Sequence, residues 1–186
     1  DEAVQRLQAG VERATRLVEQ LLALAREERG GVRQREPVAI CDLVREVVDD
    51  LLPLADARDV DVGMTRADPV VVDGNRDALR VLVRNVLDNA IRHSPSGGQV
   101  DVSVEHGAGA GKRALLLVTD QGPGIAPAER ERVFDRFYRV PGAAAGGSGI
   151  GLALVRSVAR HHGGEVRLED APSGTGLRVA VELPAV

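Results

Sequence analysis

The 186-residue sequence has no tryptophan, one tyrosine, two phenylalanines and one cysteine. With so few aromatic residues, a core must be built from Val, Leu, Ile and Ala, which is feasible because 44% of the residues are hydrophobic. Since Cys41 is alone, no internal disulfide or cysteine-based zinc site can form within the chain. A small buried residue is the favoured interpretation of this thiol, over a reactive one.

Long hydrophobic runs and an excess of basic residues are also lacking. No apolar run approaches the ~20 residues that span a bilayer, and no signal peptide opens the chain, so we expect the chain as given to be soluble. The net charge is −4, whereas a nucleic-acid-binding domain needs a basic face, so we expect no nucleic-acid partner. The length suits one sizeable domain with an appendage.

The appendage is predicted at residues 1–29, where apolar residues recur in steps of three and four. This heptad seam predicts a helix that packs against another helix, and Gly30-Gly31 is a natural stop before a linker over residues 30–36. The pattern fits the later helix of a hairpin or bundle whose earlier helix is absent. A simple dimerising coiled coil is the alternative.

Residues 37–186 are predicted to form an α+β two-layer sandwich, with helices on one face of a mixed sheet. Apolar periodicities of two and of about 3.6 separate the expected strands from the expected helices. The strands are expected at 37–40, 60–64, 69–72, 100–104, 114–119, 165–169 and 177–183, and the helices at 41–57, 75–93, near 127–133 and at 148–162.

The helix over 75–93 carries a polar edge beside its buried face. At about 100° per residue, Asn85, Asn89, Arg92 and His93 lie side by side on that edge. Because asparagine is a poor helix former, two of them one turn apart indicate a ligand. Ordinary solvated polar residues remain the alternative.

Two glycine motifs suit a nucleotide. Asp120, followed by Gly122 and Gly124, ends an apolar strand, where a carboxylate can accept a hydrogen bond from an exocyclic amine such as that of adenine. The run 147–152, Gly-Ser-Gly-Ile-Gly-Leu, leads into a helix whose free N–H groups can bind phosphates. It matches neither a Walker loop nor a Rossmann fingerprint. For the Asp120 motif the alternative is an ordinary turn after a strand, and for the run 147–152 it is a flexible hinge.

Most of the aromatic residues gather between residues 134 and 139, the run Phe-Asp-Arg-Phe-Tyr-Arg. They are predicted to anchor a mobile lid, from which Arg136 and Arg139 can reach phosphate oxygens. Solvated arginines are the alternative. Thr175, between two glycines, can place a hydroxyl near a ligand, although a turn explains the pattern equally well. We interpret His161-His162 as a helix end rather than a metal site.

In this order, the motifs resemble the N, G1, F, G2 and G3 boxes of sensor histidine kinases. The matching runs are Asn85-x-x-x-Asn89-Ala90, Asp120-x-Gly122-x-Gly124, Phe134-x-Arg136-Phe137, Gly147-x-Gly149-x-Gly151-Leu152 and Gly174-Thr175-Gly176. The resemblance implies an ATP-binding catalytic domain of Bergerat fold over residues 37–186. Residues 1–29 are similar to the second helix of the family's dimerisation and phosphotransfer hairpin.

The resemblance implies ATP and Mg²⁺ as ligands, first along the asparagine helix. Asn89 would bind Mg²⁺ through its amide oxygen, with Asn85 supporting the metal and the phosphates from one turn away. Arg92 would contact a phosphate where many relatives have lysine, and His93 would flank the nucleotide where many have tyrosine. The catalytic side chains would be Asn85, Arg136 and Arg139.

The remaining ligand contacts implied by the resemblance come from the loops. Asp120 would accept a hydrogen bond from the adenine amino group, and the glycines after it would make room for the base. The ATP lid would extend from about Ile125 to residue 147. The residues expected to hold the nucleotide here are Asp120, Gly122, Gly124, Ile125, Gly147, Gly149, Ile150, Gly151, Leu152 and Thr175.

The resemblance further implies transfer of the γ-phosphate to a histidine, and from there to an aspartate of a response regulator receiver domain. In the family the acceptor histidine lies on the first helix of the hairpin, but residues 1–36 contain no histidine, so we expect no autophosphorylation. The parent protein would be a homodimer through the hairpin. It would be an inner-membrane sensor with this part in the cytoplasm, attached to the membrane only through missing N-terminal segments.

Other functions remain open from the sequence. An ATPase of the gyrase, chaperone and mismatch-repair group needs an acid to activate water, and Asn85 at that position cannot act as a base. An anti-sigma-type serine kinase fits better, although the aromatic motif and the heptad helix favour a histidine kinase. A dimerisation module that has lost nucleotide binding is the third alternative.

Overall fold

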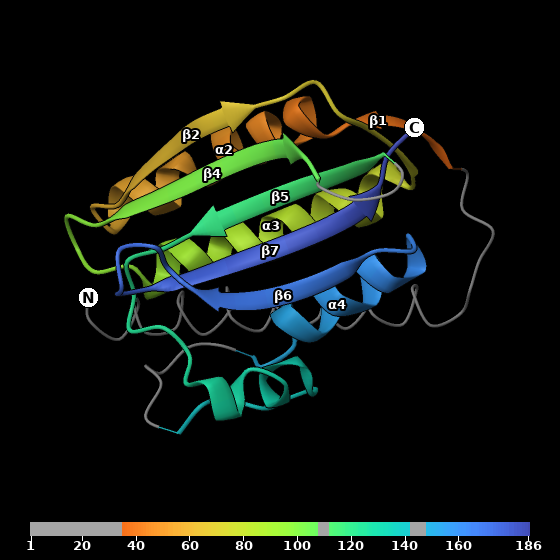
Figure 1. Cartoon of the computed structure of the whole chain (residues 1–186). Helices are drawn as coiled ribbons and strands as arrows, with labels where there is room; N and C mark the ends of the chain where they lie inside the picture. The colour runs from red at the N-terminus through yellow and green to blue at the C-terminus, as the bar shows by residue number, and fades with distance from the viewer. Residues whose placement is uncertain (1–34, 108–111, 142–147) are drawn as a thin grey trace, which may run out of the picture.

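The computed structural model describes residues 35–107, 112–141 and 148–186, and they form an α+β two-layer sandwich, as predicted. Within this part of the chain, a five-stranded mixed sheet is covered on one face by three helices (Figure 1). The elements are β1 (Glu36–Ala39), α2 (Ile40–Ala57), β2 (Asp61–Ala67), β3 (Val71–Gly74), α3 (Arg76–His93), β4 (Gln99–His106), β5 (Arg113–Thr119), two 3₁₀ turns η1 (Pro127–Glu129) and η2 (Arg132–Phe134), α4 (Gly151–His161), β6 (Glu165–Asp170) and β7 (Leu177–Pro184). The helix predicted over 1–29 lies outside the described residues.

The five-stranded sheet has the order β2-β4-β5-β7-β6. Strands β2 and β4 are parallel and the other neighbours are antiparallel, including the predicted β4–β5 hairpin, in which Val104 lies opposite Leu116. Alternate residues of β5 are buried, as expected for a strand with one face on the core. Strands β1 and β3 form a separate antiparallel pair.

The three helices bury the faces that their periodicity predicts. In α3 the side chain of Asn75 caps the first turn by accepting a hydrogen bond from the N–H of Ala78 at 2.9 Å. Helix α2 continues through Pro53 to Ala57, so this proline neither ends it nor marks its boundary. Cys41 is buried and its thiol donates to the carbonyl of Asp68, which confirms its interpretation as a small buried residue.

The structure corrects two predicted helices. Helix α4 begins at Gly151 rather than at residue 148, because Gly149 has a φ of +70°, a left-handed conformation that an α-helix does not contain. The short helix expected near 127–133 is instead the two 3₁₀ turns. Within the described ranges, none of the helices combines the length and the hydrophobicity that a membrane span requires.

Helix α4 ends at a buried histidine, as expected for a helix terminus. The ring Nε2 of His162 accepts a hydrogen bond from the N–H of Asn75 at 3.1 Å, so Nδ1 must carry the proton and donate to the carbonyl of Val158 at 2.8 Å. Because Asn75 precedes α3 and His162 follows α4, this ring ties the start of one helix to the end of the other.

Candidate nucleotide-binding site

Asp120 follows β5 and its carboxylate is held by the backbone of two loops. Its side-chain Oδ1 accepts hydrogen bonds from the N–H of Gly122 at 2.8 Å and from the N–H of Leu177 at 3.1 Å. Its own N–H donates to the carbonyl of Leu177 at 2.9 Å, which extends the pairing of β5 with β7. One carboxylate oxygen, Oδ1, is therefore engaged, whereas Oδ2 makes no hydrogen bond within the part of the chain that the structure describes.

Burial decides the electrostatics of this carboxyl group, which is 5% exposed. Desolvation raises the pKa of Asp120 above its ordinary value, and the two backbone N–H groups and the nearby His93 oppose part of that rise. A buried carboxylate with one oxygen unbonded to any described residue is a strong acceptor for an amine or amide donor.

Glycines let the chain close tightly around Asp120. A Cβ atom on Gly176 would lie 1.9 Å from the carbonyl oxygen of Asp120, and Gly176 has a φ of +110°. The carbonyl of His93, at the end of α3, packs against Gly122, and the carbonyl of Gly176 lies near Gly124. We call Asp120, Gly122, Gly124, Gly176 and Leu177 the Asp120 cluster. Leu177 was missed by the sequence reasoning, although it directly follows the last glycine motif.

The polar edge of α3 lies beside this cluster, because His93 ends α3 and its carbonyl packs against Gly122. Asn85 and Asn89 are both half-buried. The amide nitrogen of Asn85 donates to the carbonyl of Val81 at 2.8 Å. The amide of Asn89 makes no hydrogen bond to any of the described residues. Arg92 pairs with Asp88, one helical turn before it.

The glycine run before α4 is partly described. Gly149 packs against the backbone of Phe137 and Tyr138, where a Cβ atom would lie 2.7 Å from the nearest atom, and its carbonyl accepts a hydrogen bond from the N–H of Phe137 at 2.9 Å. Ile150 is buried and its N–H donates to the hydroxyl of Ser148 at 3.2 Å, Gly151 opens α4, and the N-cap residue Ile150 makes no side-chain capping bond. The first N–H groups of α4 can therefore bind an anion.

The predicted lid begins with residues 125–139, which we call the arginine-held segment. Arg156 on α4 donates to the carbonyl of Phe134 at 3.2 Å and places its guanidinium carbon 4.7 Å from the centre of the Phe134 ring. Arg130 donates to the carbonyl of Ile125 at 3.0 Å and pairs with Asp170 at the end of β6. Neither arginine was identified from the sequence, because each makes contacts that are remote along the chain.

Only part of the aromatic anchor is confirmed. Phe134 is buried, and Tyr138 is half-buried, with its hydroxyl bonded to Glu129 and Arg132 over its ring. Phe137, in contrast, is 62% exposed and has a φ of +63°, so it does not anchor the segment through its side chain.

The remaining predicted ligands are exposed, half-buried or outside the described residues. Arg136, Arg139 and Thr175 are exposed, and Leu152 is half-buried in the first turn of α4. Gly147 lies outside the described residues. The structure thus joins His93 to the Asp120 cluster and Gly149 to the arginine-held segment. It shows no contact of the Thr175 hydroxyl with either group.

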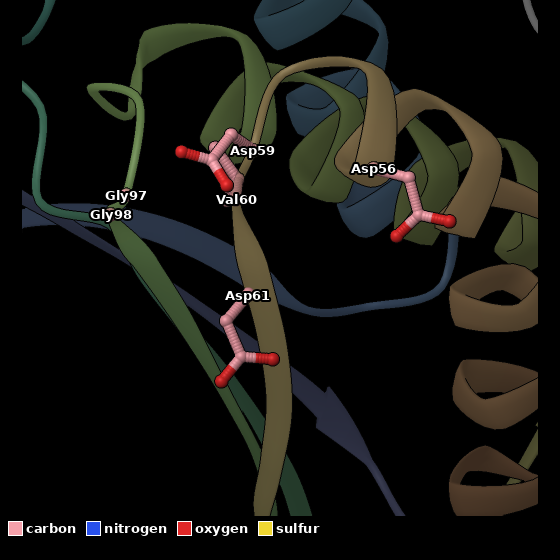
Figure 2. A pocket seen from close by; sticks show the side chains of 6 residues that line it. All are labelled: Asp56, Asp59, Val60, Asp61, Gly97 and Gly98. Atoms are coloured by element: carbon pink, nitrogen blue, oxygen red, sulfur yellow. The ribbon is translucent and has the colours of Figure 1, made fainter.

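A surface hollow elsewhere on the domain does not coincide with these residues. It has a volume of about 450 Å³ and is lined by Asp56, Asp59, Val60, Asp61, Gly97 and Gly98 (Figure 2). Three aspartates line it, one at the end of α2, one in the following turn and one at the start of β2, and its lining includes none of the predicted nucleotide ligands. Among the described residues there is no group of three or more side chains able to hold a metal ion.

Known proteins are similar to this chain in sequence. Residues 74–186 match the family described as histidine kinase-, DNA gyrase B-, and HSP90-like ATPase. The chain is 39% identical to the sensor protein QseC of Salmonella typhi over 176 residues, which are 94% of this chain and 38% of that relative. It is 38% identical to the sensor protein kinase PmrB of Pseudomonas aeruginosa, with 94% of this chain and 36% of that relative covered. The chain thus spans little more than a third of these relatives.

Solved structures share its fold. The mycobacterial sensor histidine kinase MprB is 36% identical and superposes with a TM-score of 0.71, over 81% of this chain and 97% of that one. Full-length ShkA in complex with AMPPNP is 27% identical, with a TM-score of 0.81 over 100% of this chain and 38% of that one.

Proposed function

Since this chain belongs to the histidine kinase-, DNA gyrase B- and HSP90-like ATPase family, as its five motifs predict, we propose that it binds ATP with Mg²⁺ and donates the γ-phosphate to a histidine. Its ATP-binding domain is of the kind found in sensor histidine kinases. The observation that carries the proposal is the Asp120 carboxylate, which the backbone holds by Oδ1 while Oδ2 stays open.

The Asp120 cluster is the proposed adenine site. Oδ2 accepts a hydrogen bond from the exocyclic amino group, and the glycines on either side leave room for a flat base. His93 flanks the nucleotide from the end of α3. Because guanine has a carbonyl where adenine has this amino group, the carboxylate would repel it, so the site selects adenine nucleotides.

The polar edge of α3 is the proposed metal and phosphate site. An amide oxygen suits Mg²⁺, which takes few protein ligands and completes its shell with phosphate and water oxygens. The Asn89 amide, unbonded within the described residues, fits this role, and Asn85 supports it from one turn away. The bound metal would neutralise phosphate charge. Gly147, Gly149, Ile150, Gly151 and Leu152 would offer backbone N–H groups to the phosphates.

Phosphoryl transfer needs positioning and charge neutralisation rather than covalent chemistry from the protein. Arg136 and Arg139 of the arginine-held segment, together with Arg92, would stabilise the charge on the transferred group, and Thr175 would lie at the edge of the site. Asn85 cannot take a proton from water, which disfavours hydrolysis and favours transfer to an acceptor.

The proposed acceptor is a histidine on a helix outside this chain. The four histidines of the 186 residues are His93, His106, His161 and His162, and none is followed by an acidic residue. We therefore propose that the chain alone does not autophosphorylate. The parent would be a homodimer through its helical hairpin, would pass the phosphate to a response regulator, and would place this part in the cytoplasm below a membrane anchor.

The test is calorimetry of ATP binding with and without Mg²⁺, followed by phosphate transfer to a separately supplied histidine-bearing hairpin. Mg²⁺-dependent binding with transfer supports the proposal. Binding with phosphate release but no transfer would favour an ATPase, and transfer to serine would favour a serine kinase. No binding would favour a dimerisation module.

A further inference from the structure

Asp88 lies on α3 directly before the proposed metal ligand, and its carboxylate is already in use. Its Oδ2 accepts a hydrogen bond from Nε of Arg92 at 2.7 Å, one helical turn further on. The two side chains are 20% and 29% exposed, so solvent screens this pair only in part. An acidic residue four positions before a basic one is the favourable order for such a pair on a helix.

This pair occupies only one side of the guanidinium group. Arginine has an Nε and two terminal nitrogens with five N–H donors in a fixed plane. The terminal nitrogens of Arg92 make no hydrogen bond to the described residues. The Arg92 carbonyl accepts a hydrogen bond from Arg58 at 2.7 Å, which also fixes the end of the helix. Arg92 is thus held by its backbone and by Nε, and its terminal donors stay open.

The orientation of this open side follows from the helix. At about 100° per residue, Asp88, Arg92, Asn85 and Asn89 follow one another within a single stripe, with Arg92 between Asp88 and the asparagines. A guanidinium group whose Nε edge is bonded to Asp88 keeps the N–H donors of its other edges for an acceptor on the asparagine side. That is where the phosphates of the proposed nucleotide lie.

We propose that Asp88 is a positioning residue for the nucleotide: it holds Nε of Arg92 so that the terminal nitrogens meet a phosphate. The proposal rests on the proposed function. An arginine side chain is otherwise free to rotate, and a binding group that is already oriented loses less entropy when the ligand arrives. A lone carboxylate beside a triphosphate would repel it, so the charge of Asp88 is tolerable only in combination with Arg92.

The experiment is a double-mutant cycle with Asp88→Ala and Arg92→Ala, read out as the dissociation constants of ATP and of adenosine. We expect Asp88→Ala to weaken ATP binding about tenfold, but not to weaken it further in the Arg92→Ala background, where Asp88 is a lone carboxylate that repels the phosphates. Adenosine binding should not change, because adenosine has no phosphate. Asp88→Asn keeps an oxygen acceptor for Nε and should bind ATP within about threefold of the unchanged chain.

The control is Asp77→Ala, which removes an exposed carboxylate from the opposite end of the same helix. Thermal unfolding checks that all variants fold. The role of Asp88 would be overturned, without affecting the proposed function, by any of three results. These are equal losses of affinity for ATP and adenosine, additive losses of ATP affinity in the double mutant, or tighter ATP binding by Asp88→Ala. Absence of ATP binding by the unchanged chain would overturn the proposed function, and this inference with it.

Discussion

The Asp120 cluster and the arginine-held segment, at the two ends of the proposed nucleotide site, are built in different ways. The first is held by backbone hydrogen bonds and close glycine contacts at the ends of two paired strands. The second is held mainly by the side chains of Arg130 and Arg156, and most of its polar residues are exposed. The proposed adenine end is therefore preorganised by the fold itself, whereas the proposed phosphate end depends on individual charged side chains.

The largest expected effect comes from filling the closest approach in the Asp120 cluster. Gly176→Ala should lower the free energy of unfolding by about 3 kcal/mol, because the new Cβ would meet the Asp120 carbonyl and the positive φ adds strain. Gly174→Ala is the matched control, since Gly174 also has a positive φ but nothing within 4 Å of a Cβ atom. It should cost about 1 kcal/mol in denaturant unfolding. Equal costs would refute the close approach as the cause.

The next largest effect concerns recognition rather than folding. Asp120→Asn keeps an oxygen for the N–H groups of Gly122 and Leu177, but it places an amide donor against the adenine amino group. We expect ATP binding to weaken by about 10- to 100-fold in calorimetry, while the melting temperature changes little. Asp61→Asn, on the edge strand β2, should leave binding unchanged. An unchanged affinity of Asp120→Asn for ATP would contradict the assignment of the Asp120 cluster as the adenine site.

A smaller effect is expected at the other end of the site. Arg156→Met keeps the apolar stem but loses the bond to Phe134 and the contact with its ring, so the free energy of unfolding should fall by about 1 kcal/mol. ATP should bind more weakly, whereas adenosine should not. Arg160→Met, an exposed position on the same helix, should change stability by less than about 0.5 kcal/mol. If adenosine binding also weakened, the two ends of the site would not be separate units.

The smallest effect is a dependence on pH. Because burial raises the pKa of Asp120 in the folded chain, the ionised carboxyl costs folding free energy above that pKa, and the cost disappears as the pH falls through it. Adenine binding should follow the opposite course, because protonation removes the charged acceptor. As the pH is lowered from neutral, ATP affinity should therefore begin to fall at a higher pH than it would if Asp120 had the pKa of an ordinary aspartate. Asp120→Asn should lack this component of the pH profile.

The two ends of the site also differ in how far the sequence predicts them. The polar edge of α3 and the strand before Asp120 follow from local periodicity, so both were predicted from residues 75–93 and 114–120 alone. The bond from the N–H of Leu177 to Asp120 depends on the pairing of β5 with β7, which joins residues 57 positions apart. No local pattern specifies such a register.

The arginine-held segment was the harder part for a related reason. Phe134, Phe137 and Tyr138 look equivalent in sequence, yet one is buried, one is half-buried and Phe137 is mostly exposed. Arg156 and Gly149 contact the segment from beyond it in the chain, Arg156 at the ring of Phe134 and Gly149 at the backbone of Phe137. The start of α4 was misplaced because the backbone at Gly149 is left-handed, which its sequence context does not reveal.

The bond between His162 and Asn75 has a consequence for hydrogen exchange. The N–H groups at the beginning of a helix usually face water and exchange rapidly with solvent deuterium. The Asn75 amide instead donates to a buried imidazole on another helix, so its proton can exchange only when α3 and α4 separate. The exchange rate of this one amide therefore reports how often the start of α3 and the end of α4 come apart.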